Sequence, residues 1–295
     1  MFSRHVAWTR GAGCLDLATA LSDGPPIAVD GDLRAVCIKE RIEYLVCRKL
    51  TSFDLVSTIV PHEVDLHRVD QITAAVADGP HSPLAVTVAA RLGEVLSVPV
   101  TVATAYHTRE DETSAVARLA QLAEPHRGKI TQKPIPADSA TAIVDILTPT
   151  SLLVIGAPGG SWFQRQLYGP GHRLVVGAPG GAVLVRSQET KCFHKAEDPA
   201  AVAVGPDLTI TDASRIIANP VVPVTDEGRL IGIVRQSTLS RSGNHRTVGD
   251  LMEPPIAVNA TEPLSAASEL AEFLDGAPIP IIDDNHTLIG VVRLP

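Results

Sequence analysis

The middle of the chain constrains the fold most strongly, because short aliphatic runs alternate there with amphipathic helical patterns. In the helical stretches, apolar residues recur every three or four positions, which is the spacing of one buried helix face. The runs predicted as strands are residues 71–77, 98–106, 129–135, 151–156 and 182–185. Strands that alternate with helices in this way indicate an α/β fold with a doubly wound parallel sheet.

Capping residues mark the starts of the predicted helices. Ser82 is expected to cap the first helix, with Pro83 at the first helical position. Thr108 and Asp111 have the spacing of a capping box for the second helix, and Asp138 is expected to cap a third.

The sequence GAPGG occurs twice, at residues 156–160 and 177–181. The first copy follows a predicted strand and the second precedes one. Ligands of doubly wound sheets bind beyond the carboxyl ends of the strands. We therefore expect the first copy to be a ligand loop and the second to be a turn.

The stretch ITAAVADGPHSPLAVTVAARLGEVLSVPVTVATAY, followed by spaced glycines, resembles universal stress protein domains over about residues 70–187. The nucleotide-binding branch of that family carries a glycine, two residues, a second glycine, nine residues and a third glycine. Gly156, Gly159 and Gly169 have this spacing. Ala178-Pro179 stands where the family commonly has Ala-Pro before its last strand.

The resemblance implies a bound adenine nucleotide, either ATP or a related one. It would place Asp78 against the adenine or ribose, Ile155 beside the base, and the glycines around the phosphates. Glycine lets backbone N–H groups approach phosphate oxygens closely, and Gly171 adds another such position. Pro170 departs from the family, which has Ser or Thr there. The alternative is that these glycines only shape a loop that binds nothing.

The last hundred residues contain a repeat. Residues 209–234 and 262–292 each show a short Ala-rich helix, an apolar strand, a turn and a second strand ending in Ile-Gly-[Ile/Val]-Val. With the connecting sequence VGDLMEPPIAVNATEPL, residues 195–295 resemble tandem cystathionine β-synthase (CBS) modules. Such modules form α+β pairs that often bind adenosine nucleotides between the repeats.

The family's ribose contact departs in this chain. After the Gly-Ile-Val strand the family has Thr or Ser, two residues and Asp, whereas here the sequence reads Arg235-Gln236-Ser237-Thr238. We therefore expect the CBS pair to serve dimerisation or regulation rather than ligand capture.

The first 69 residues give the weakest signal. Residues 15–38 resemble a third, isolated CBS-like segment with a helix, a strand, an Asp-Gly turn and a second strand. Residues 40–50 are predicted to be a helix and residues 54–60 a strand. The expected domains are residues 1–69, 70–190 and 191–295.

Composition and charge exclude several classes of protein. The formal net charge of -8 argues against nucleic acid as a partner, which needs a concentrated basic face. No apolar run reaches the roughly 18–20 residues needed to span a bilayer, so no membrane insertion is expected. The four cysteines match no metal or redox motif, and we expect buried, reduced thiols in a cytoplasmic protein.

Catalytic and metal motifs are incomplete. His62-Glu63 and His67 lack the four-residue histidine spacing of a metalloprotease helix, and Cys192 with His194 do not complete a zinc site. No Walker lysine follows Gly156. The sequence therefore predicts a non-enzymatic, nucleotide-responsive regulatory or stress-response protein that forms a homodimer and acts on an unknown partner protein. The alternatives are a ligand-free dimeric scaffold and, less favoured, a slow ATPase.

Overall fold

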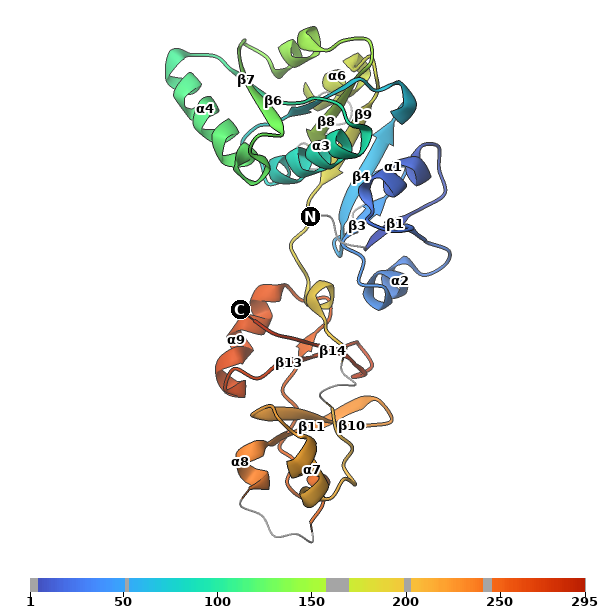
Figure 1. The fold of residues 1–295 in the computed structure, drawn as a ribbon, viewed down its shortest axis with the longest axis vertical. Coiled ribbons are helices and arrows are strands. Elements are labelled where there is room, and N and C mark those ends of the chain that lie inside the picture. The colour runs from blue at the N-terminus through green and yellow to red at the C-terminus, as the bar shows by residue number, and fades with distance from the viewer. Residues whose placement is uncertain (1–4, 51–52, 158–169, 199–202, 241–245, 295) are drawn as a thin grey trace. The chain divides into compact units, whose positions relative to one another are not determined.

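The computed structural model describes residues 5–50, 53–157, 170–198, 203–240 and 246–294. The chain divides into two compact units (Figure 1). The first unit comprises Met1–Leu33 and Ile42–Gln188, and the second comprises Arg34–Arg41 and Glu189–Pro295. The expected division at residues 69 and 190 stays a prediction.

The first unit is built on a nine-stranded sheet with the order β2-β1-β3-β4-β9-β8-β5-β6-β7. Neighbouring strands run parallel on either side of one antiparallel pair, β4 with β9. The strands are β1 (Val6–Trp8), β2 (Ile27–Ala28), β3 (Tyr44–Val46), β4 (Ser57–His62), β5 (Gln71–Ala75), β6 (Val100–Tyr106), β7 (Ile130–Pro136), β8 (Ser151–Gly156) and β9 (Ala182–Arg186). The predicted mixed α/β class with a largely parallel sheet is confirmed.

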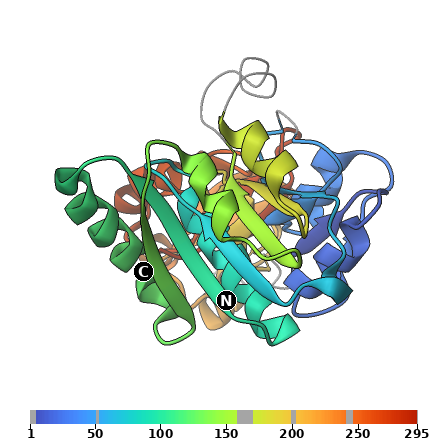
Figure 2. The ribbon, with the colours of Figure 1, turned by 90° about the horizontal axis from the view of Figure 1, so that it is seen from above.

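Helices cover both faces of this sheet (Figure 2). In β8, Leu152 and Val154 belong to one apolar core, while Leu153 and Ile155 belong to the core on the opposite face. The first core includes α1 (Cys14–Leu21), α3 (Ser82–Leu96) and α4 (Arg109–Ala123); the second includes the 3-10 helix η3 (Ala140–Ile146) and α6 (Pro170–Gly177). Two short 3-10 helices, η1 (Leu66–Arg68) and η2 (Glu124–His126), lie in connections.

The helix starts follow the sequence in part. The capping box of α4 is confirmed: the Asp111 N–H donates to Thr108 Oγ1 at 3.2 Å, and the Thr108 N–H donates to the Asp111 carboxylate at 3.0 Å. The third predicted helix is a 3-10 helix, and its cap is Ser139 instead of Asp138, with Thr141 N–H donating to the Ser139 hydroxyl.

Two predictions for the first 69 residues are wrong. The strand expected to end the CBS-like segment is a helix, α2 (Leu33–Lys39), and β2 pairs parallel with β1 instead of forming a hairpin. Residues 40–50, which were expected to form a helix, contain the strand β3 instead. Consecutive residues Leu45, Val46 and Cys47 are all buried, as in a parallel strand covered on both faces.

The second unit contains the predicted repeat. In the first copy, α7 (Ile210–Ile216) precedes the antiparallel pair of β10 (Val221–Asp226) and β11 (Arg229–Arg235). In the second copy, α9 (Leu264–Leu270) precedes the antiparallel pair of β13 (Ile279–Ile282) and β14 (Leu288–Val292). The remaining elements are η4 (Cys192–Lys195), α8 (Gln236–Leu239), η6 (Val248–Asp250), β12 (Val258–Asn259) and η7 (Ala271–Leu274).

Candidate functional site

Three of the described candidate residues, Asp78, Ile155 and Gly156, lie at or just after the carboxyl ends of β5 and β8. The two strands are parallel neighbours, with Ala75 opposite Ile155. From β5 the chain continues outward to β6 and β7, whereas β8 and β9 lie on the other side of β5, so the strand order reverses here. Such a reversal is the usual ligand position of an open α/β sheet. Asp78 follows β5, and Gly156 ends β8.

The structure does not place the other three predicted glycines in a phosphate loop. Gly159 and Gly169 lie outside the described residues. Gly171 lies in the first turn of α6, which begins at Pro170, so the expected open loop at this point is instead helical. Proline suits the first turn of a helix, where its missing N–H would have no partner within the helix.

Asp78 is paired with an arginine that the sequence did not indicate. Its carboxylate is largely exposed and forms an ion pair with Arg118 of α4, whose side chain is 23% exposed. The pair spans 40 residues of sequence, so no local pattern could have revealed it. Arg118 neutralises the Asp78 carboxylate, and it places a guanidinium group at this edge of the sheet.

Ile155 is only 3% exposed and packs in the core beneath η3 and α6. On either side its backbone is paired with Ala75 and Leu184. A base lying against Ile155 would therefore require neighbouring side chains to move.

His81 links three segments at this edge, which the sequence also did not indicate. Its Nδ1 lies 2.9 Å from Ser187 Oγ and accepts the Ser187 N–H at 3.2 Å. The Ser187 hydroxyl also lies 2.8 Å from the carbonyl oxygen of Pro80. A Cβ added to Gly156 would lie 3.0 Å from the Cβ of His81, so the glycine allows the close approach of β8 to this loop.

Ser82 closes the loop after β5 instead of capping α3. Its buried hydroxyl donates to the carbonyl oxygen of Ala77 at 2.8 Å and accepts the Ala77 N–H at 3.2 Å. The N-cap of α3 is His81, with no side-chain capping hydrogen bond, and Pro83 lies in the first turn. The prediction for Ser82 is wrong because its hydroxyl bonds to the backbone of Ala77 in the preceding loop and not to N–H groups of the helix.

The second GAPGG copy is a turn, as predicted. It begins with the last residue of α6, Gly177, and leads into β9. A Cβ on Gly180 would lie 2.5 Å from the carbonyl oxygen of Ser151, and one on Gly181 would lie 2.5 Å from that of Glu63. Gly181 also has a φ of +88°. Backbone already fills the space that a ligand would need here.

In the second unit, Arg235 stands at the position where the CBS resemblance expects Thr or Ser. Its Nε donates to both carboxylate oxygens of Glu253 at 3.1 Å. One terminal nitrogen donates to Asp275 at 2.8 Å and the other to the carbonyl oxygen of Phe273 at 3.0 Å. The guanidinium of the first repeat is thus occupied by the connecting segment and by the second repeat.

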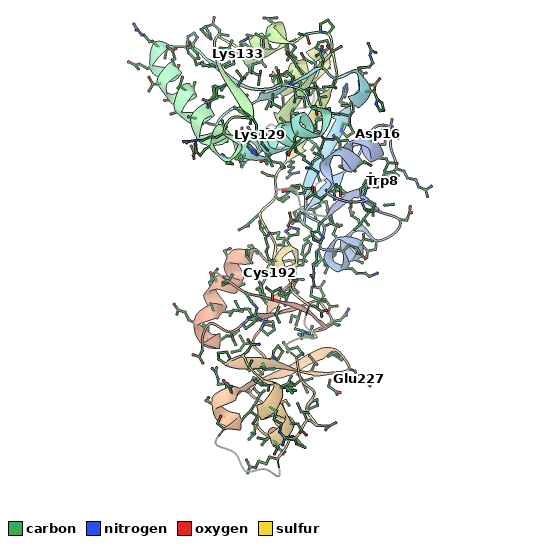
Figure 3. The ribbon with its side chains drawn as sticks, in the orientation of Figure 1. Trp8, Asp16, Lys129, Lys133, Cys192 and Glu227 are labelled. Carbon is green, nitrogen blue, oxygen red and sulfur yellow. The ribbon has the colours of Figure 1, made fainter. Side chains whose placement is uncertain are left out.

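Metal-binding groups do not converge in the part of the chain that the structure describes: no three His, Cys, Asp or Glu side chains lie together. His62 ends β4 and His67 lies in η1, so they do not share a helix. All four cysteines are buried and none forms a disulfide with another, and burial raises the pKa of Cys192 (Figure 3) to about 11. Among the described helices, none combines the length and apolarity needed to cross a bilayer.

Comparison with known proteins identifies one domain. Residues 198–243 match the CBS domain family. CBSX2 from Arabidopsis thaliana is 22% identical, with a TM-score of 0.31 over 35% of this chain and 87% of that one. CBSX2 in complex with AMP is 23% identical, with a TM-score of 0.30 over 35% of this chain and 89% of that one. The CBS domain pair of protein MJ0100 is 22% identical, with a TM-score of 0.31 over 36% of this chain and 90% of that one. That structure is a complex with 5′-methylthioadenosine and S-adenosyl-L-methionine.

No curated protein sequence matches the chain. The family match alone shows that the chain carries a CBS domain at residues 198–243. The likeness of residues 70–187 to universal stress proteins rests on their sequence pattern.

Proposed function

We propose that this chain is a non-enzymatic regulatory protein that binds an adenine nucleotide at the carboxyl ends of β5 and β8. The observation that carries the proposal is the reversal of strand order at β5 and β8, where Asp78 follows β5 and Gly156 ends β8. The resemblance to nucleotide-binding universal stress proteins implies a cytoplasmic, stress-linked role. CBS domains commonly serve regulation by adenine nucleotides, which agrees with this role.

The charges at this edge suit a nucleotide. Arg118 pairs with Asp78, and Arg186 ends β9 beside His81. A nucleotide could draw Arg118 to its phosphates, because guanidinium groups bind phosphate oxygens well. Asp78 would then be free to accept hydrogen bonds from ribose hydroxyls.

Titration calorimetry of the full chain with ATP, ADP and AMP tests this proposal. Asp78→Asn should weaken binding by about ten- to hundredfold, since hydrogen bonds to charged groups contribute about 1.5–3 kcal/mol each. Asp145→Asn is the matched control, because Asp145 is also an exposed carboxylate of the first unit, in η3. Equal affinities of the two variants would refute the site, and nucleotide turnover above a buffer control would refute the non-enzymatic assignment.

The second candidate function is a ligand-free interaction scaffold, and the Arg235 contacts favour it for the CBS module. CBSX2 and protein MJ0100 have been solved with adenosine ligands. We propose that the module of this chain does not bind such a ligand, because two carboxylates already occupy Arg235 and would repel phosphate. The full chain should then bind one ATP, and a second equivalent that disappears in Arg235→Gln would contradict this proposal.

We also propose that the chain forms a homodimer. Ile216 and Phe273 of the second unit are 64% and 62% exposed, and large apolar side chains in such positions often mark protein interfaces. Light scattering should give twice the mass of one chain, and Phe273→Asp should lower it. A single-chain mass at micromolar concentration would exclude the dimer.

A further inference from the structure

From the loop after β5, His81 contacts the ends of both β8 and β9. It belongs to the loop after β5, its Cβ lies close to the α-carbon of Gly156 at the end of β8, and its ring contacts Ser187 after β9. The Ser187 hydroxyl extends the contact to the Pro80 carbonyl. The separation of 106 residues between His81 and Ser187 makes this a tertiary connection.

The hydrogen bond from the Ser187 main chain favours one state of the imidazole. The main-chain N–H of Ser187 can only donate, so its bond to Nδ1 requires that this nitrogen carry no proton. The Ser187 hydroxyl then donates either to Nδ1 or to the Pro80 carbonyl oxygen. In the neutral ring the proton then lies on Nε2. A proton added at Nδ1 would take the acceptor away from the Ser187 N–H and leave Nδ1 bonded only to the Ser187 hydroxyl oxygen.

The charged surroundings also oppose protonation of this ring. Burial and then the nearby positive charge of Arg186 lower the pKa of His81. On its own loop, the carboxylate of Asp78 is paired with Arg118. The first turn of α3 carries no acidic side chain, and the adjoining residues Gly156 and Ser187 carry no charge.

We propose that His81 is a positioning residue that holds the three strand ends in their nucleotide-binding arrangement while Nδ1 is unprotonated, and that protonation releases them. The inference rests on the proposed function of this site. Because the pKa of His81 is lower in the folded state, folding favours the neutral ring. The contribution is complete above about pH 6.5 and is lost as the pH falls from there through the folded pKa.

Substitution by asparagine separates the contact from the titration. In His81→Asn the side-chain oxygen can take the place of Nδ1 as acceptor for Ser187 N–H, but it gains no proton. His81→Ala removes the acceptor altogether. His126→Asn is the matched control, because burial also lowers the pKa of His126, which lies in η2 beside the far edge of the same sheet.

ATP affinity between pH 5 and 7.5 is the first measurement. At pH 7.5 we expect His81→Asn to bind within about twofold of the unchanged chain and His81→Ala to bind roughly two- to tenfold more weakly, as for the loss of one hydrogen bond. Phosphate itself titrates near pH 6. The decisive quantity is therefore the ratio of affinities of the unchanged chain and His81→Asn, which should fall with pH. The chain with His126→Asn should keep the profile of the unchanged chain.

Hydrogen exchange of the Ser187 amide, with NMR titration of His81, tests the contact without nucleotide. We expect a His81 pKa below 6.5, and lower protection of the Ser187 amide in His81→Ala than in His81→Asn. A pKa at or above 6.5, equal protection in both variants, or a constant affinity ratio would overturn the inference. If the chain binds no ATP while the amide responds as expected, the proposed function fails and the tertiary contact stands.

Discussion

The two GAPGG copies have the same five residues and occupy opposite ends of neighbouring parallel strands. The first begins at Gly156, the last residue of β8, and the second ends at Gly181, just before β9. Around Gly156 the closest contact of an added Cβ is the Cβ of a side chain, that of His81. Around Gly180 and Gly181 the closest contacts are backbone carbonyl oxygens.

This difference shows that the position relative to the strand decides what a glycine-rich segment can do. At the amino end of β9 the glycines are needed because backbone packs on backbone. At the carboxyl end of β8 the glycine allows a side chain to approach, and that side chain belongs to the loop with the candidate ligand residue Asp78. A search of the sequence for glycine alone would not distinguish the two segments.

Gly181→Ala should give the largest effect. The added Cβ would lie 2.5 Å from the Glu63 carbonyl oxygen, and the φ of +88° is strained for alanine. We expect a loss of about 3 kcal/mol or more of unfolding free energy. Denaturant unfolding followed by tryptophan fluorescence measures it, since Trp8 lies in β1 of the same sheet.

Gly128→Ala is the control for this experiment. Gly128 has a similar φ of +76°, but an added Cβ would meet nothing within 4 Å. Its cost should be limited to backbone strain, about 1 kcal/mol. Equal losses in the two variants would show that packing at the second GAPGG copy is not what requires glycine.

Gly156→Ala should give an intermediate effect on stability and a clear effect on ligand binding. The Cβ contact at 3.0 Å can be relieved if His81 moves by a few tenths of an ångström, so we expect a loss of about 1–2 kcal/mol. Because that movement disturbs the contact with Ser187, ATP affinity should fall roughly two- to tenfold. Gly79→Ala places its Cβ in open space and should leave stability unchanged.

The strands β5, β6, β7, β8 and β9 could be predicted because their signals are local. Aliphatic runs, the capping box at Thr108 and the order of strand and glycine each involve a few consecutive residues. The repeat of the second unit was predictable for a related reason: two copies of one pattern support each other. At the other extreme, β1 and β2 are strands of three and two residues, too short to show a period.

The contacts of the candidate site could not be predicted because they are tertiary. His81 and Ser187, Asp78 and Arg118, and Arg235 and Asp275 are far apart in sequence, and none of these pairs has a characteristic spacing. Ser82 illustrates the limit within a single loop. A hydroxyl at the start of a helix can accept helix N–H groups or bond to the preceding turn, and the sequence does not distinguish these partners.

Arg118→Gln should give the smallest effect on stability. It tests the candidate ligand site at the carboxyl ends of β5 and β8, where the first GAPGG copy begins. The ion pair with Asp78 is partly solvated, so its loss should cost about 1 kcal/mol or less. Binding should respond according to charge: ATP affinity should fall several-fold because a phosphate partner is lost, while adenosine, which has no phosphate, should bind equally or more tightly because Asp78 is released. Arg127→Gln removes an exposed ion pair with Glu124 and should change neither affinity. Equal losses for ATP and adenosine would mean that Arg118 only supports the fold, and an unchanged ATP affinity would place the phosphates away from α4.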